Sequence, residues 1–469
     1  MKKIYLILIL GLTVYLQSCK VGPDFQKPAY TAPGAFRFDT ATTDTIVNLR
    51  WWQLFNDPVL DTLIKTALAE NRDVMIAAAR VQTAMANLGY TKAGQWPVFG
   101  MNISANGGNY TGFLDNKNSS TFAAYPQMNW EIGFWGKYRR LNEAAKAELL
   151  ASEYGKRTVQ LGLITAVAST YFQLLDNKSK LEISENTLKS RKNALDIIQS
   201  RFDYGIVSEV DLNQAQIQYA ISEAAVPFYQ RAIAQNESTL SVLLGRNPGE
   251  IVTGIPLFEQ EIPPDIPTGI PSQLLTRRPD ILEAEALYAA QNARIGVAEA
   301  MRLPSLNLTG LFGYASNDLM SLTTGGLAWA AGGSLLGPVF EFGKNKRRAE
   351  MERYKTEAAL RKYESVALQS FKEVEDALVA IKTLKRQLEA DKMRNTAAIN
   401  AEKLSQERYD KGQTSYLEVL ESQRQSFDGQ LQFSETRKQL LNAYVALYKA
   451  LGGGWITPEE EKTAGTGSK

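Results

Sequence analysis

Residues 201–208 read RFDYGIVS, and residues 408–415 repeat them as RYDKGQTS. Further matches lie at the same offset of about 207 residues. They are Gly89, Ala93 and Pro97 with Gly296, Ala300 and Pro304; Gly136 and Lys137 with Gly343 and Lys344; and Leu244 and Gly245 with Leu451 and Gly452. Four separated matches at one offset, without a gap, indicate that one supersecondary unit is duplicated. This predicts two repeats, residues 58–247 and 271–453, joined by a Pro-rich equatorial linker at 248–270.

Each repeat has the same expected order: a helix, two strands, a very long helix, a tight turn and a second long helix. The first helix is expected at about Pro58–Ala93. In the strands, apolar and polar side chains alternate with a period of two, as in Met101–Asn106 and Leu306–Phe312. A looser fourth strand is expected at Leu327–Phe340. Such alternation over about ten residues is typical of membrane-barrel strands with lipid on one side and water on the other.

Ordinary half-buried strands of a soluble sheet alternate in the same way. Aromatic residues flank the predicted strands, however, and rings gather at membrane interfaces. They are Tyr110, Tyr125, Trp130, Trp135, Tyr314 and Trp329. These flanks favour the membrane interpretation.

The long helices are expected at about Tyr138–Phe202 and Lys346–Tyr409, each roughly 95 Å long at 1.5 Å per residue. Their apolar residues recur at steps of three, four and seven, which is the pattern of a coiled-coil seam. The returning helices are expected at about 209–244 and 416–451. Thr158–Leu175 is uncharged and could also be interpreted as a transmembrane helix. Its polar residues, such as Gln160 and Gln173, and the continuous seam disfavour that alternative.

Four amphipathic strands cannot close a barrel, because open edges would leave backbone groups unpaired in lipid. The smallest bacterial barrels have about eight strands. The sequence therefore predicts an α+β membrane protein in which protomers share a transmembrane β-barrel, four strands each. The long helices are expected to project from the membrane, pack side by side and continue the barrel as a tube.

The N-terminus has the features of a targeting signal. Lys2 and Lys3 precede an apolar run from Ile4 to Leu16, which is too short to span a bilayer. The run ends just before Cys19, the only cysteine, in a sequence like a bacterial lipobox. We expect a signal peptide at 1–18, lipidation of Cys19, a lipid-anchored segment at 19–57 and a flexible tail at 454–469. The alternative is an ordinary cleaved signal with an incidental cysteine.

Composition excludes several function classes. The 469-residue chain has a formal net charge of +2, which implies no nucleic-acid partner. It contains no histidine, the commonest general base and metal ligand. The sequence has neither a Gly-rich phosphate loop nor a nucleophile motif. We therefore expect no enzymatic activity, no cofactor and no metal site.

Several motifs, in order along nearly the whole chain, resemble those of outer-membrane efflux lipoproteins of the TolC (NodT-type) family. They are VGPDF at 21–25 with Pro28, WWQLFNDPVL at 51–60, RRPDI at 277–281, ARIGVA at 293–298 leading to PSL at 304–306, and GPVF at 337–340. The resemblance implies a homotrimer with a twelve-stranded barrel, a long periplasmic helical barrel and an equatorial domain in the bacterial outer membrane. It also implies a periplasmic adaptor protein and an inner-membrane transporter as partners, and export of drugs or other small molecules.

The resemblance further implies roles for the two turns. The positions that match the adaptor-contacting tips are Gly205, Ile206, Val207 and Ser208, and Gly412, Gln413, Thr414 and Ser415. Turn chemistry alone also accounts for part of this pattern, because glycine permits a left-handed turn and serine caps the next helix.

Four residues match the family's aperture and gate. Glu418 and Glu421, three apart on one helix face, match positions that line the closed aperture. Asp211 and Tyr409 match positions that latch the tips by hydrogen bonding in some relatives. Acids near a helix N-terminus also stabilise the helix dipole, which is the alternative role for all three carboxylates.

The preferred function is thus a passive duct of a tripartite (RND-type) efflux pump. Two alternatives stay open: a type I protein-secretion duct of the same architecture, and a lipid-anchored coiled-coil scaffold without a pore.

Overall fold

The computed structural model describes residues 20–38, 51–108, 119–263, 271–324 and 327–453. In the first repeat the elements are a 3-10 helix (Trp51–Phe55), α2 (Pro58–Glu70), α3 (Arg72–Ala93), β1 (Val98–Gly108), β2 (Ser119–Ile132), α4 (Lys137–Asp203) and α5 (Glu209–Leu243). In the second repeat they are α6 (Pro271–Arg277), α7 (Pro279–Ala300), β3 (Ser305–Ser316), a 3-10 turn (Leu319–Ser321), β4 (Leu327–Leu336), α8 (Lys344–Asp410) and α9 (Tyr416–Ala450).

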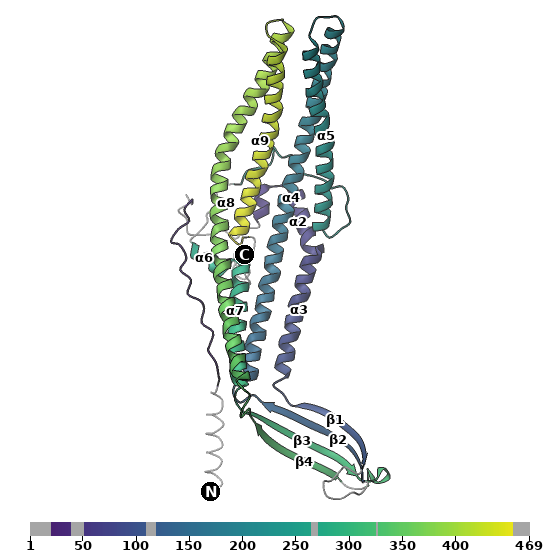
Figure 1. Ribbon diagram of the computed structural model, residues 1–469, viewed down its shortest axis with the longest axis vertical. Coiled ribbons are helices and arrows are strands. Elements are labelled where there is room, and N and C mark those ends of the chain that lie inside the picture. Colours follow the sequence, from purple (N-terminus) through teal and green to yellow (C-terminus); the bar gives the residue numbers. More distant parts are fainter. Residues whose placement is uncertain (1–19, 39–50, 109–118, 264–270, 325–326, 454–469) are drawn as a thin grey trace, which may run out of the picture. The chain divides into compact units, whose positions relative to one another are not determined.

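The internal repeat is confirmed in the backbone (Figure 1). The two long helices, α4 and α8, each have 67 residues, and the returning helices, α5 and α9, each have 35. Glycines with positive φ also recur at equivalent positions. These pairs are Gly136 (78°) and Gly343 (81°), Gly205 (73°) and Gly412 (70°), and Gly245 (71°) and Gly452 (70°). The duplication has therefore preserved the turns as well as the helices.

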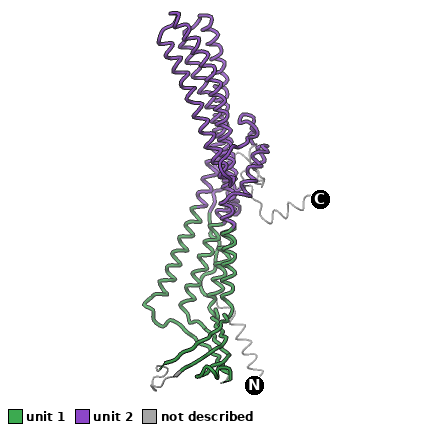
Figure 2. Tube along the Cα trace, turned by 90° about the vertical axis from the view of Figure 1, so that its right-hand side faces the viewer, with its two compact units in different colours: residues 1–30, 79–153, 283–365 green, residues 31–78, 154–282, 366–469 purple. Residues whose placement is uncertain are grey.

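The chain forms two compact units, coloured separately in Figure 2. The first contains residues 1–30, 79–153 and 283–365, and includes the β-sheet. The second contains residues 31–78, 154–282 and 366–469, and includes the hairpin turns after α4 and α8.

The sheet in the first unit is antiparallel, in the order β1-β2-β3-β4. The expectation that the fourth strand reaches Phe340 is wrong, because β4 ends at Leu336. Gly337 then lies so close to Pro304 that a Cβ atom there would be 2.8 Å from the proline ring. Pro338 follows and has no backbone N–H to donate to a ladder.

The single helix expected at Pro58–Ala93 is wrong as well, because Asn71 divides it into α2 and α3. Asn71 has an extended backbone (φ −66°, ψ 131°) and its side-chain oxygen accepts from the amides of Asp73 (2.9 Å) and Val74 (3.2 Å). Its side-chain amide donates to the carbonyl of Leu243 (2.9 Å). The residue thus ends one helix and caps the next while it contacts a distant segment.

The second unit has a core built around a buried carboxylate. Asp57 caps α2 and also accepts hydrogen bonds from the Tyr171 hydroxyl (2.6 Å) and the Gln260 side chain (2.8 Å). Phe55 packs edge-on against Phe172 at 4.9 Å between ring centroids. Burial, chiefly, together with the hydrogen bond to Asp57, raises the pKa of Tyr171 above its ordinary value. The WWQLFNDPVL motif therefore supplies structural contacts here.

Within the described ranges, α4 is the one helix long and apolar enough to cross a membrane, and half of its apolar window is buried inside the protein. Val167, Ala168 and Tyr171 are fully buried. This burial agrees with a packed coiled-coil helix.

Candidate functional site

The two hairpin turns have the same backbone. In each turn the glycine amide donates to a carbonyl three residues earlier, at 2.8 Å for Gly205 and 2.9 Å for Gly412. The next residue donates to a carbonyl five residues earlier, at 2.8 Å and 2.9 Å. Both glycines have φ near +70°, where a side chain is strained. This pattern of bonds ends α4 and α8 and reverses the chain.

The first turn is capped by its own side chains. The Ser208 hydroxyl accepts from the Asp211 amide (3.3 Å), and the Asp211 carboxylate accepts from the Ser208 amide (3.2 Å) and hydroxyl (2.8 Å). This reciprocal arrangement is a capping box. Around it the surface is apolar, because Tyr204 is 84% exposed and Ile206 is 70% exposed.

The second turn is charged and polar. Ser415, the equivalent of Ser208, makes no side-chain cap bond. Instead, the Glu418 carboxylate accepts from Arg408 (2.7 Å) and from the Thr414 hydroxyl. Lys411 and Gln413 stand where the first turn has Tyr204 and Ile206. Leu417, the counterpart of Val210, is exposed in the same way as Val210.

Glu421 lies one helical turn further along α9 and has a partner of its own. Its carboxylate accepts from Arg424 (2.7 and 3.0 Å) and from the Gln425 side chain (2.7 Å). These bonds, with Arg424 first, lower the pKa of Glu421 to about 2. Both predicted aperture carboxylates are thus paired with arginines of their own hairpin.

A small hydrophobic core joins the two hairpins just behind the turns. Its buried members are Ile198, Leu212, Ala215, Tyr416, Val419 and Leu420. Tyr409 packs against this core and against the Tyr416 ring, with centroids 5.3 Å apart. The Arg201 guanidinium, from the other hairpin, lies 4.9 Å from the centre of the Tyr409 ring. Arg201 and Tyr409 therefore connect α4 with α8.

Asp211 and Tyr409, which match latch positions of some relatives, make separate contacts within one copy. In the part of the chain that the structure describes, Asp211 bonds to Ser208 and no hydrogen bond joins it to Tyr409. Sequence reasoning missed Arg201, Arg408 and Arg424. The spacing of three between Glu421 and Arg424 was a readable signal, whereas the other two contacts depend on the turn and on the packing of the hairpins.

Cys19, the predicted lipidation site, lies outside the described residues, but the residues after it are firmly held. Lys20 pairs with Asp24 and Glu143, both at 2.8 Å. The buried Arg140 donates to the carbonyls of Val21 (3.2 Å) and Gly22 (2.6 Å). Gly22, with φ +91°, lies so close to Gly296 that a Cβ atom would be 2.5 Å from its Cα. The VGPDF and ARIGVA motifs therefore fit each other by backbone contact.

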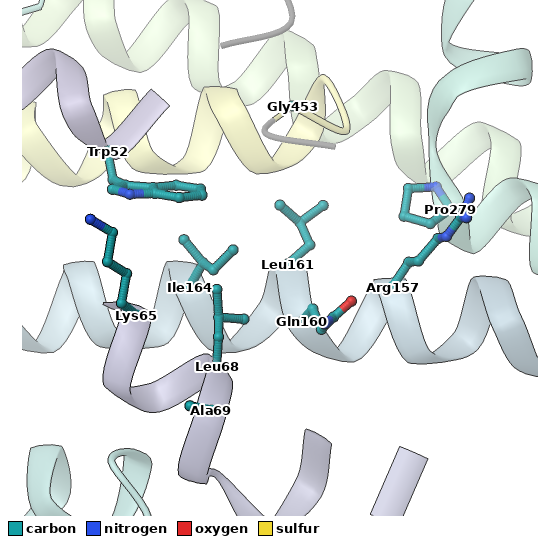
Figure 3. A pocket seen from close by; sticks show the side chains of 10 residues that line it. All are labelled: Trp52, Lys65, Leu68, Ala69, Arg157, Gln160, Leu161, Ile164, Pro279 and Gly453. Carbon is teal, nitrogen blue, oxygen red and sulfur yellow. The ribbon is translucent and has the colours of Figure 1, made fainter. Parts of the chain in front are cut away.

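A hollow of about 450 Å³ in the second unit is shown in Figure 3. Trp52 lies across it from Ile164, with Arg157 and Pro279 toward the other end. The Trp52 indole N–H donates to Asp61 (3.0 Å), which also pairs with Lys65 (2.5 Å). The lining of this hollow is mainly apolar, and the cationic side chains in it are Lys65 and Arg157. Across the described ranges, no group of three or more His, Cys, Asp or Glu side chains is placed to hold a metal ion.

Comparison with known proteins gives consistent matches along nearly the whole chain. The model of a family described as "Outer membrane efflux protein" matches residues 63–246 and again 270–453. The probable efflux pump outer membrane protein TtgC of Pseudomonas putida is 32% identical over 469 residues, covering 96% of each chain. The solved structure of the outer-membrane channel OprN is similar with a TM-score of 0.87 and 28% identity, covering 93% of this chain and 100% of that one. The Campylobacter jejuni CmeC outer membrane channel gives a TM-score of 0.86 and 26% identity, covering 96% and 98%.

Proposed function

The chain belongs to the outer membrane efflux protein family, and on that premise we propose that three copies form one passive export duct. The protein is an outer-membrane channel component of an efflux system. The observation that carries the proposal is the sheet, whose order leaves β1 and β4 as edges. Unpaired edge groups in lipid cost several kcal/mol each, so β1 of one copy pairs with β4 of the next. Three copies then supply twelve strands.

An exposed seam on α5 supports association through the helices as well. Val210, Ile217, Ile221 and Phe228 follow one another at steps of seven, four and seven, which is the spacing of a coiled-coil face. In the single chain these side chains are between 49% and 63% exposed. An apolar stripe of this kind marks an interaction surface. In our proposal this stripe on α5 packs against a second copy of the chain.

The proposed gate is the second hairpin. Glu418 and Glu421 line the aperture of the trimer, each with its arginine, Arg408 or Arg424. Paired carboxylates favour cations less strongly than bare ones would, because the arginines offset their potential. Arg201 and Tyr409 hold the second hairpin against the first and so keep the aperture closed. Asp211 acts on the gate by fixing the start of α5.

The proposed adaptor contact is the pair of hairpin tips, residues 205–208 and 412–415. The first tip offers the apolar surface, with Ile206 and the adjacent Tyr204 exposed. An apolar protrusion of this kind fits a hydrophobic groove on a partner protein. The second tip contributes polar contacts around it.

The proposed lipid anchor is Cys19. A peptide bond joins it to Lys20, which is fixed beside the start of α4 by its ion pair with Glu143. Helix α4 begins five residues after the end of β2. Acyl chains on Cys19 would therefore enter the membrane beside the strand ends and add affinity through their buried methylenes.

The proposed partners are a periplasmic adaptor and an inner-membrane RND-type transporter, which supplies the energy. The duct itself carries out no chemistry. Relatives named for efflux of antibiotics and toluene support small organic molecules as cargo. The hollow beside Trp52 has no part in this proposal.

The test is the mass and conductance of the purified protein. In detergent, light scattering should give three chains, each somewhat lighter than the 52.0 kDa of the full sequence because the signal peptide is removed. Planar bilayers should show a stable pore. The double variant Ile217→Asp, Ile221→Asp should dissociate the trimer, because it puts charge into the seam. The matched control Gln216→Asp, Ala220→Asp changes exposed positions beside the seam and should stay trimeric. A monomeric wild-type protein without conductance would contradict the proposal.

A further inference from the structure

The register of the sheet assigns each strand residue to one of two faces. Side chains of directly paired residues point to the same side of a sheet, and neighbours along a strand point to opposite sides. Trp130 pairs with Leu308, and Ile132 pairs with Leu306. At the end of the sheet nearest the helices this face is apolar, with Trp130, Ile132, Leu306, Leu308 and Leu335. Its polar members, Ser120 and Ser316, lie at the far end. The opposite face carries Asn102, Ser104, Gln127, Asn129, Glu131, Asn307, Thr309 and Ser334.

A hollow of about 970 Å³ lies at the helix-side end of the apolar face. Trp130, Ile132 and Leu306 contribute its wall from the strands. Helix α3 contributes through its last turns and α4 through its first turns. The short connections after α3 and before α4 complete the lining. The Trp130 indole N–H donates to the carbonyl of Gln95 (2.9 Å), which fixes the ring at this boundary. The hollow therefore begins where the lipid-facing surface ends.

Three cations line the helical side of this hollow: Lys92 of α3, and Arg139 and Lys146 of α4. Arg139 and Lys146 are seven residues apart, so they lie on one face of α4. All three side chains are exposed, and among the described residues none of them makes an ion pair. The one carboxylate in the lining, Glu143, already pairs with Lys20 and Arg140. The hollow thus has an excess of positive charge beside an apolar wall.

We propose that this hollow binds the phosphate of an anionic phospholipid headgroup in the near leaflet of the membrane. The phosphate lies among Lys92, Arg139 and Lys146, where each cation near the surface attracts anionic lipid. The acyl chains run along the apolar face from Ile132 and Leu306, and the Trp130 ring lies at the interfacial level that aromatic residues prefer. A free phosphate ion would use the cations but not the apolar wall. The proposal rests on the proposed function, because it takes the apolar face to be in contact with lipid.

The test is lipid retention by the full-length trimer, measured by native mass spectrometry during titration with phosphatidylglycerol. The variant is the triple substitution Lys92→Gln, Arg139→Gln, Lys146→Gln. The control is Lys382→Gln, Lys392→Gln, Lys403→Gln, which removes the same charge from exposed positions of α8. The site variant should bind phosphatidylglycerol at least about tenfold more weakly, and the control should bind it as the wild type does. Phosphatidylcholine should bind the wild type weakly, and inorganic phosphate at millimolar concentration should not displace phosphatidylglycerol.

Equal phosphatidylglycerol affinity in the site variant and the wild type would overturn the proposal. Displacement by inorganic phosphate would also overturn it, because the site would then be a plain anion site. Conductance in planar bilayers separates this failure from failure of the proposed function. The site variant should still form trimeric pores, whereas a wild-type protein that forms none would refute the duct itself.

Discussion

The tip at Gly205 and the tip at Gly412 share one backbone but present different surfaces. The turn bonds agree to within 0.1 Å, and the caps Ser208 and Ser415 have nearly the same φ and ψ (−78° and 157° against −79° and 156°). Yet the first tip is apolar and self-capped, while the second holds Glu418 between Arg408 and Thr414. The backbone of the turn is thus the same in both repeats, whereas the outward side chains differ. We infer from this difference that the first tip makes the main, apolar contact with the adaptor, and that the second hairpin, whose tip adds polar contacts, carries the gate.

The largest expected effect is on docking by the first tip. Tyr204→Asp with Ile206→Asp should reduce efflux at least about tenfold, because desolvating a carboxylate in an apolar contact is costly. The matched change at the second tip, Lys411→Asp with Gln413→Asp, should reduce efflux much less. Drug susceptibility of cells that produce equal amounts of each variant measures this. An equal loss from both pairs would remove the distinction between the tips.

The next effect concerns the contact between Arg201 and Tyr409. Tyr409→Ala removes the ring under the guanidinium, an interaction of about 0.5–1 kcal/mol at exposed sites, and should raise closed-state current a few-fold. Tyr409→Phe keeps the ring and should leave the current low, whereas a hydroxyl latch would fail in both variants. Phe202→Ala, at the equivalent position of the first tip, is the control. Single-channel recording distinguishes the two mechanisms by the result for the phenylalanine variant.

A smaller effect is expected from the pairing of Glu421. Because its pKa is about 2, Glu421 stays ionised between pH 7 and pH 4, and its contribution to cation selectivity should be constant there. Arg424→Gln removes the main cause of the lowered pKa, so the titration should move up toward 4.5. Selectivity should then fall between pH 5 and pH 4 in the variant only. Reversal potentials in a salt gradient measure it, and identical pH profiles would show that Glu421 does not face the permeating ions.

The smallest effect separates the two caps. Ser208→Ala removes a side-chain cap and should destabilise the protein by about 1 kcal/mol. Ser415→Ala removes no cap bond, so its free energy of unfolding should change little. Thermal unfolding of the trimer compares the two variants under one condition. A larger loss from Ser415→Ala would mean that the capping difference between the turns has been assigned wrongly.

The sequence predicted the repeat, the strands and the hairpins because these depend on local periodicity and on glycines in the turns. It failed at Asn71, since apolar periodicity continues through that residue and its amide bonds to Leu243, far along the chain. It also failed at the end of β4, where close contact between Gly337 and Pro304 decides the boundary.

In the candidate site, as in the fold, local features could be predicted from the sequence, whereas contacts between distant segments could not. The turns and the two carboxylates Glu418 and Glu421 could be identified by motif position. The arginine partner of Glu421 was readable from its spacing, but the contact of Arg201 with Tyr409 joins two hairpins and has no signature along the chain. The lipid-facing hollow required the register of β2 with β3, which the alternation pattern alone does not fix.

The central claim is that edge strands of different copies pair to close one barrel. Cysteines introduced in β1 (Asn102 or Ser104) and β4 (Ala328, Ala330 or Gly332) test it by oxidation and denaturing electrophoresis. Within one copy β1 and β4 are separated by two strands, about 14 Å in all, which is too far for a disulfide. We predict that at least one pairing of positions gives a covalent ring of three chains. Failure of every combination to cross-link, with single cysteines confirmed as reactive, would contradict a barrel shared between copies.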